Sequence, residues 1–138
     1  MTDQENRKKL IYEDRNYTSE QISNLSRYIG FGLIAITFVI VTGQHSVLNV
    51  ILQKYRIILG LVALSGILTI IFDYLQYVSG SLSSKKAARR TDQRFLVDRK
   101  SMYFKLRVFF YQSKQVTSIV GSILLLVIFA ITFFISES

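Results

Sequence analysis

Three long stretches of this chain carry almost no formal charge, and they constrain its fold more than any other feature. They are residues 28–53, residues 57–84 with Asp73 as the single acid, and residues 115–136. A helix rises 1.5 Å per residue and needs about 20 mostly apolar residues to cross the hydrocarbon core of a bilayer. Each stretch is long enough, and each is apolar around most of the helix circumference, where a soluble bundle would keep polar faces. The sequence therefore predicts an all-α integral membrane protein with three transmembrane helices.

The predicted spans divide the chain into seven segments. The first connector is itself apolar, and it can either lie flat at the membrane surface or extend one of the spans. The second connector is long enough for a helix or a helical hairpin, but hardly for a separate globular domain. By residue number, the division is a tail over 1–27, spans over 28–45, 57–78 and 115–136, connectors over 46–56 and 79–114, and a terminus over 137–138.

The distribution of Lys and Arg predicts the direction of threading. The tail holds five basic residues, the first connector two and the second connector ten, and none follows the third span. Basic flanks are retained on the cytoplasmic side. Because three crossings alternate sides, fifteen basic residues share one face and two the other. We therefore expect the N-terminus and the second connector in the cytoplasm and the C-terminus outside, in a multi-pass protein of the cell membrane, taken to be a bacterial inner membrane.

The composition leaves little material for catalysis. The chain has 138 residues with no Cys and one His, so thiol chemistry, disulfides and zinc or haem centres lack their usual ligands. A nucleophile, a base and an orienting group cannot be assembled from one His and spans that hold a single acid. We therefore expect no enzyme activity, no metal and no cofactor.

Four polar residues share one face of the second span. Ser65, Thr69, Asp73 and Gln76 fall within about 80° of the helix circumference at 100° per residue. An acid in an apolar run is costly in hydrocarbon and is a functional hypothesis by default. This face can be a water-lined path or a proton or cation site, completed by neighbouring copies. Alternatively, Asp73 and Gln76 lie among the cytoplasmic headgroups while the two hydroxyls bond to their own helix.

The second connector has a net charge of +8, from ten basic residues less two Asp. These cations can be simple topology determinants, or they can contact anionic lipid headgroups or an anionic ligand such as a nucleotide or nucleic acid. The residues predicted for lipid or ligand contact are Lys85, Lys86, Arg89, Arg90 and Arg94. An apolar stripe at helical spacing predicts a helix packed on the membrane or on other helices. The stripe consists of Phe95, Met102, Leu106 and Phe109.

Two further patterns concern helix boundaries and helix packing. Thr18 and Gln21 have the spacing of a capping box, which predicts a helix that begins near Ser19 and continues through the first span. Small residues four apart in the third span predict a close helix contact. They are Thr117, Ser118, Gly121 and Ser122.

The overall layout resembles a known family. The chain has, in order, a charged helical tail that ends in a span, a short outer loop, a second span, and the run Asp73-Tyr74-Leu75-Gln76-Tyr77 leading into a basic helix. In the order of these segments, it resembles the SLATT-type small membrane effectors of bacteria. The resemblance covers roughly residues 5–100 and rests on layout. It implies an association with nucleotide-signalling conflict systems and action by perturbing the membrane. The third span is additional to that family's two-span plan.

Two functions of different class follow. The first is an oligomeric pore or membrane-perturbing effector, a homo-oligomer that conducts past the polar face of the second span. The second is a non-catalytic anchor or regulatory subunit that docks a cytoplasmic protein through its basic connector and tail. Membrane lipid is a partner in both.

Overall fold

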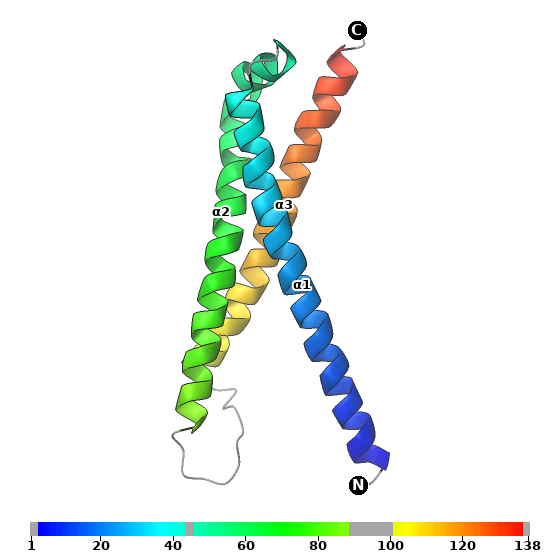
Figure 1. Cartoon of the computed structure of the whole chain (residues 1–138), viewed down its shortest axis with the longest axis vertical. Coiled ribbons are helices and arrows are strands. Elements are labelled where there is room, and N and C mark those ends of the chain that lie inside the picture. The colour runs from blue at the N-terminus through cyan, green and yellow to red at the C-terminus, as the bar shows by residue number, and fades with distance from the viewer. Residues whose placement is uncertain (1–2, 44–45, 89–100, 137–138) are drawn as a thin grey trace.

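The computed structural model describes residues 3–43, 46–88 and 101–136, and this part of the chain forms three helices and no strand. They are α1 (Asp3–Thr42), α2 (Ser46–Ala88) and α3 (Met102–Ser136). The chain contains no Pro, the residue that most often interrupts helical hydrogen bonding. Figure 1 shows α1 and α3 running in one direction and α2 in the other, so the N-terminal end of α1 and the C-terminal end of α2 lie at the same end of the molecule.

All three helices are long and apolar enough to cross a membrane by length and composition. The qualifying segments are Tyr17–Thr42, Leu48–Lys85 and Met102–Phe134. The prediction of an all-helical chain with three helices of spanning length is thereby confirmed. α1 has 40 residues, which corresponds to about 60 Å against a hydrocarbon core of about 30 Å. A large part of α1 must therefore lie outside the hydrocarbon in any such arrangement.

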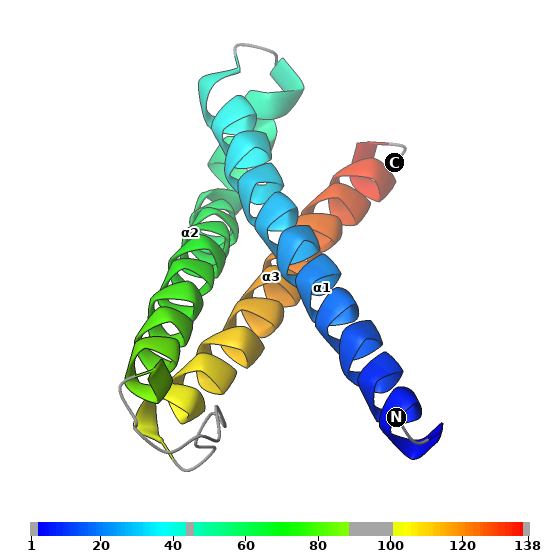
Figure 2. The same ribbon diagram turned by 60° about the horizontal axis from the view of Figure 1, so that its bottom comes forward.

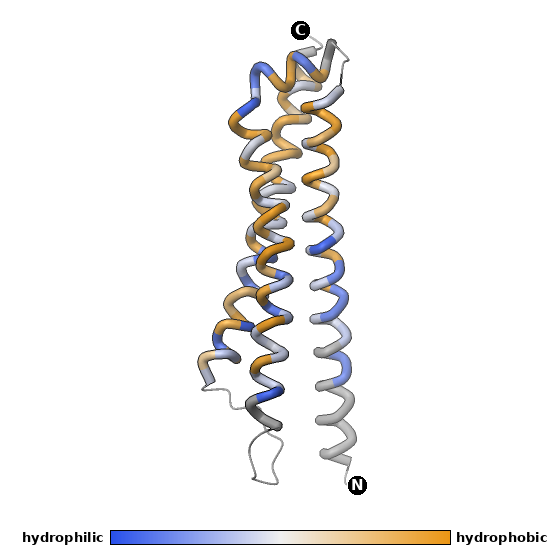
Figure 3. Tube along the Cα trace, turned by 60° about the vertical axis from the view of Figure 1, so that its left-hand side comes forward, coloured by the Kyte–Doolittle hydropathy of each residue, from blue (hydrophilic) through white to orange (hydrophobic). Residues whose placement is uncertain are grey.

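The described part of the bundle reverses the usual distribution of polarity in a soluble protein. Large apolar side chains such as Phe31, Ile57 and Leu126 point outward and are exposed. In Figure 3, hydrophobic residues dominate the half of the molecule near the C-terminus, and hydrophilic residues gather toward the other end. An exposed apolar surface of this extent suits lipid as the surrounding solvent. The buried apolar core is comparatively small: Leu33, Ile40, Ile51, Leu59, Val62, Leu125 and Ile128.

Glycines bring the three helices close together near the middle of the bundle. A Cβ on Gly66 of α2 would lie 2.8 Å from the carbonyl oxygen of Gly30 on α1, so the two backbones are in direct contact. A Cβ on Gly121 of α3 would collide with the Ser65 hydroxyl of α2 and with Leu33 of α1. Small residues permit this close approach of spanning helices, where dispersion forces and hydrogen bonds replace the hydrophobic effect.

The structure corrects two predicted boundaries. Segment 46–56 is not a loop, because α2 begins at Ser46 and is helical up to a bend at Tyr55, whose φ of −120° and ψ of 23° are not helical. Ile51 in this short piece is buried against the core, which explains the apolar sequence of the segment. Thr18 does not cap a helix, because α1 is already continuous from Asp3. Because helical turns lie on both sides of Thr18, there is no helix N-terminus at this position for its side chain to cap.

The second connector is also largely helical where it is described. α2 continues ten residues past the predicted end of its span, to Ala88. α3 begins at Met102, and the carbonyl of Ser101 accepts hydrogen bonds from the amides of Phe104 and Lys105 at its start. Met102, Leu106 and Phe109 of the predicted stripe therefore lie on α3, with Met102 and Phe109 exposed, whereas Phe95 lies outside the described residues.

Candidate functional site

Asp73 is the centre of a buried polar cluster that joins all three helices. Its carboxylate accepts hydrogen bonds from Ser23 and Arg27 of α1 and from Lys114 of α3. We call these four residues the Asp73 cluster. The Asp73 side chain is 6% exposed, so it faces protein, and neither a neighbouring copy nor the headgroup layer is needed to satisfy it. A buried carboxylate is tolerated when it is paired and when its oxygens accept further hydrogen bonds, and both conditions hold here.

Lys114 is the most buried member of the cluster. Its side chain is 0% exposed, and its ammonium lies 2.6 Å from Asp73 Oδ1. The same ammonium donates to the Ser23 hydroxyl, which in turn donates to Asp73 Oδ1 at 3.0 Å. The ring of Tyr111, 5.4 Å from the ammonium, adds a cation–π contact. Lys114 thus ties α3 to both other helices at one point.

Arg27 occupies the open side of the cluster. Its Nε and Nη2 both lie 2.8 Å from Asp73 Oδ2, and Nη2 also donates to the Tyr77 hydroxyl at 3.1 Å. The guanidinium carbon lies 5.6 Å from the centre of the Tyr77 ring. The Arg27 side chain is 35% exposed, in contrast to the side chains of Asp73 and Lys114, which are 6% and 0% exposed. The two N–H groups on Nη1 have no acceptor among the described contacts.

The other residues of the predicted polar face have separate roles. Thr69 is fully buried, and its hydroxyl lies 2.8 Å from that of Thr117 on α3 while also donating to the carbonyl of Ser65. Ser65 donates to the carbonyl of Val62 within its own helix. Gln76 is half-buried, and its buried Oε1 has no hydrogen-bond partner. Three of the four predicted residues therefore face the interior of this one chain, and Gln76 does not join the cluster.

The residues predicted for helix packing lie on two sides of α3. Gly121 and Ser118 are buried, and Thr117 bonds to Thr69, so these three contribute to the interior of the bundle. Ser122 is half-buried and donates to the carbonyl of Ser118. It lines a shallow apolar cleft between α1 and α3 together with Gly32 and Phe129.

Few of the predicted lipid-contacting cations can be placed. Lys85 lies on the last turns of α2 and is exposed. Lys86 belongs to the same helix. Arg89, Arg90 and Arg94 lie outside the described residues.

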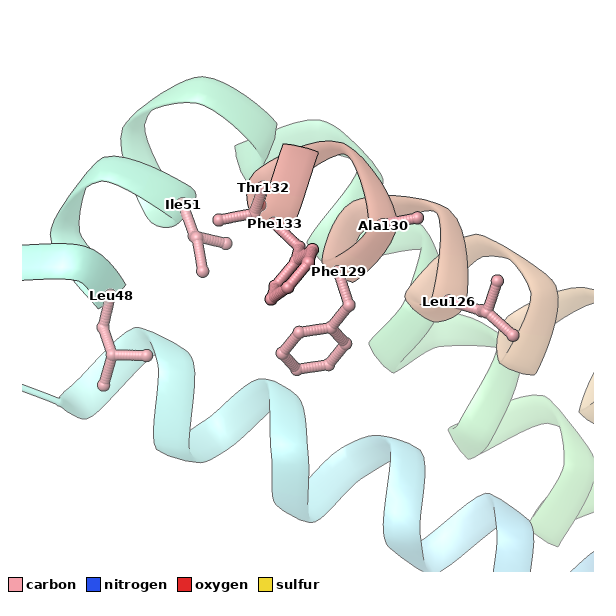
Figure 4. Close-up of a pocket in the computed structure, with 7 residues that line it drawn as sticks. All are labelled: Leu48, Ile51, Leu126, Phe129, Ala130, Thr132 and Phe133. Carbon is pink, nitrogen blue, oxygen red and sulfur yellow. The ribbon is translucent and has the colours of Figure 1, made fainter. Parts of the chain in front are cut away.

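A second, larger cleft opens between the short helical piece before Tyr55 and the C-terminal half of α3. Its volume is about 650 Å³, and Figure 4 shows aromatic and aliphatic side chains around it. The single hydroxyl in its lining, on Thr132, already donates to the carbonyl of Ile128. A polar substrate would find no partner here. The lining residues are Leu48, Ile51, Leu126, Phe129, Ala130, Thr132 and Phe133.

Sequence reasoning identified Asp73 but not its partners. Arg27 and Lys114 were interpreted only as charges that flank spans and set topology. One signal could have identified them. Arg27 directly precedes the first predicted span, Asp73 lies near the end of the second, and Lys114 directly precedes the third. Because successive spans run in opposite directions, these three positions are predicted to lie at the same membrane depth. A lone acid at that depth requires a cation as its partner.

No group of three or more His, Cys, Asp or Glu that could hold a metal ion occurs among the residues that the structure describes. Comparisons of the chain with family models, with curated proteins and with solved structures give no match. The resemblance to SLATT-type effectors therefore stays a prediction.

Proposed function

We propose that this protein is a non-conducting, multi-pass membrane anchor or regulatory subunit that docks a cytoplasmic protein partner. One observation carries the proposal: Ser65, Thr69 and Asp73, three of the four residues on the polar face of α2, are buried within the same chain. Their hydroxyl and carboxylate groups have partners there. The faces turned outward along the spans are mainly apolar and suit contact with lipid.

The expected orientation supports docking from the cytoplasm. The N-terminal end of α1, the C-terminal end of α2 and the N-terminal end of α3 lie at one end of the molecule (Figures 1 and 2). Those ends adjoin the segments that hold fifteen of the seventeen basic residues. Under the positive-inside rule this end faces the cytoplasm. The cell membrane, taken to be a bacterial inner membrane, is the proposed location.

Two elements at that end form the proposed docking surface. The first is the part of α1 before Ser23, which diverges from α2 and α3 in both views and exposes Tyr17, Glu20 and Gln21. The second is the basic connector, 79–114, with its net charge of +8. A partner with an acidic surface would be attracted to the connector, and the projecting helix offers a contact of mixed polarity. Together they define the chemistry expected of the partner.

An oligomeric pore is the competing function. It would require the polar face of α2 to turn away from Ser23, Arg27 and Lys114 and toward neighbouring copies. That rearrangement would break the Asp73 cluster and leave the Lys114 ammonium unpaired in the bundle interior. Breaking a buried ion pair by removing one partner costs about 3–5 kcal/mol. Because the pore arrangement would carry this cost and the arrangement in the structure does not, the anchor is the favoured function.

Two measurements on the full chain test the proposal. Purified protein in liposomes should leave the permeability to K⁺ and H⁺ equal to that of empty liposomes. Affinity purification from native membranes should recover one stoichiometric protein. Replacing Lys85, Lys86, Arg89 and Arg90 with Gln should release that protein, whereas replacing Lys54 and Arg56 at the opposite end should not. Ion flux that rises with protein density would overturn the anchor and support the pore.

A further inference from the structure

The Asp73 cluster is not electrically neutral. It brings two cations, Arg27 and Lys114, to one carboxylate, so one positive charge is left without a partner. The nearest acid toward the N-terminus on the same face of α1 is Glu20, seven residues before Arg27 and therefore about 10 Å away along the axis. Unbalanced charge at the edge of the hydrocarbon is costly and seeks a counter-ion.

The geometry leaves only one cation of the cluster able to meet that counter-ion. The Lys114 side chain is 0% exposed and already contacts Asp73, Ser23 and the Tyr111 ring. Arg27 is 35% exposed, and it uses Nε and Nη2 on Asp73 and Tyr77. The two unused N–H groups on Nη1 point in different directions in the guanidinium plane, and each can donate one hydrogen bond to an oxygen of a phosphate.

The position of Arg27 identifies the source of the phosphate. Arg27 directly precedes the uncharged stretch 28–53, so it lies where acyl chains end and headgroups begin. Tyr28, Tyr74 and Tyr77 are exposed, and tyrosine is enriched at that layer. In the part of α1 that follows Arg27, the outward face is apolar and suits acyl chains; it includes Phe31 and Phe38.

We propose that Arg27 and Tyr77 form a specific site for the headgroup of an anionic phospholipid, and that the unbalanced charge of the Asp73 cluster provides its selectivity for anions. Arg27 contacts the phosphate. Lys114 acts without touching the lipid, because its ammonium neutralises Asp73 and thereby frees the charge of Arg27. The site depends on membrane insertion but not on the docking function proposed above.

This charge balance makes an unusual prediction for variants. Arg27→Gln and Lys114→Met each leave Asp73 with one cation, so either cluster is neutral and should lose anion selectivity. Asp73→Asn leaves both cations and doubles the unbalanced charge, so it should bind the anion more tightly. A contribution of roughly 1 kcal/mol per charge near the membrane surface corresponds to about a fivefold change in affinity in each case.

The experiment is lipid titration of the purified full chain in a neutral detergent, read by native mass spectrometry. The probes are phosphatidylglycerol and, as a zwitterionic comparison, phosphatidylcholine. Wild type should prefer phosphatidylglycerol, R27Q and K114M should lose about fivefold of that preference, and D73N should gain about fivefold. R27K should retain it. Glycerol phosphate at millimolar concentration should not displace the lipid; displacement would overturn a lipid as the occupant.

Lys105→Gln and Arg56→Gln are matched controls, because both side chains are exposed cations outside the cluster, one on α3 and one at the opposite end. Each should change the preference less than twofold. An unchanged preference in R27Q would overturn the proposal, even if K114M failed to fold. A loss in K105Q as large as that in R27Q would also overturn it, because binding would then follow total charge. Opposite shifts in R27Q and D73N support it.

Discussion

Asp73→Asn should loosen the attachment of α3 to the rest of the bundle. The substitution keeps the shape of the side chain but removes its charge, so the fully buried Lys114 ammonium loses a carboxylate at 2.6 Å. Removing one partner of a buried ion pair costs about 3–5 kcal/mol. The lower end applies here, because the Ser23 hydroxyl and the Tyr111 ring still contact the ammonium. We expect a loss of about 3 kcal/mol, or roughly a 150-fold shift in the unfolding equilibrium.

A double-mutant cycle separates the ion pair from other effects of the substitution. Lys114→Met alone should cost less than Asp73→Asn, because Asp73 keeps Arg27 as its cation. In the double variant no buried ammonium remains, so its stability should lie within about 1 kcal/mol of Lys114→Met. The coupling energy between the two positions should then be about 2–4 kcal/mol.

The assay is reversible unfolding in mixed micelles of a mild detergent and dodecyl sulfate, followed by circular dichroism and by a distance probe between α2 and α3. Thr69→Val, which removes a hydroxyl and no charge on the same helix face, serves as the comparison. A coupling energy below about 0.5 kcal/mol would show that the Asp73–Lys114 contact does not hold α3 in place. A double variant no more stable than Asp73→Asn would refute the reasoning in the same way.

Three further predictions concern packing, hydrogen bonding and threading. Gly66→Ala should destabilise the bundle by about 1–3 kcal/mol in the same unfolding assay, because the new Cβ meets the Gly30 carbonyl. The control is Gly60→Ala, whose Cβ meets nothing within 4 Å and which should be neutral or stabilising by up to about 1 kcal/mol. Equal losses of stability in both variants would contradict the contact between Gly66 and Gly30. Thr69→Val removes the bond to Thr117 and should cost about 0.6 kcal/mol, with a loss above 2 kcal/mol pointing to a larger role. In right-side-out cells, a protease should cleave a tag at the C-terminus and spare one at the N-terminus; cleavage of both tags would contradict three crossings.

The sequence alone was sufficient to predict the number of helices and their apolar character. Long uncharged stretches can satisfy their backbone hydrogen bonds in lipid only as helices or closed barrels, and these stretches have the length of spanning helices. Helix ends were harder to predict. The capping pattern at Thr18 was overridden because α1 continues on both sides of it, and the helical piece before Tyr55 depends on burial of Ile51 against distant residues.

The candidate site divides in the same way. The sequence singled out Asp73, and the alternation of three spans predicts one common level for Arg27, Asp73 and Lys114, but no pattern identified the two cations as its partners. Which of them touch depends on how the helices rotate about their axes. That rotation is set by the close contacts of Gly30, Gly66 and Gly121. The spacing of small residues predicted a close contact at Gly121, but no local pattern specifies its partners or the contact of Gly30 with Gly66. The sequence thus predicted at which end of its helix each polar group lies. Only the packing of three helices decided that the polar face of α2 turns inward, because a buried carboxylate is stable only where cations from other helices reach it.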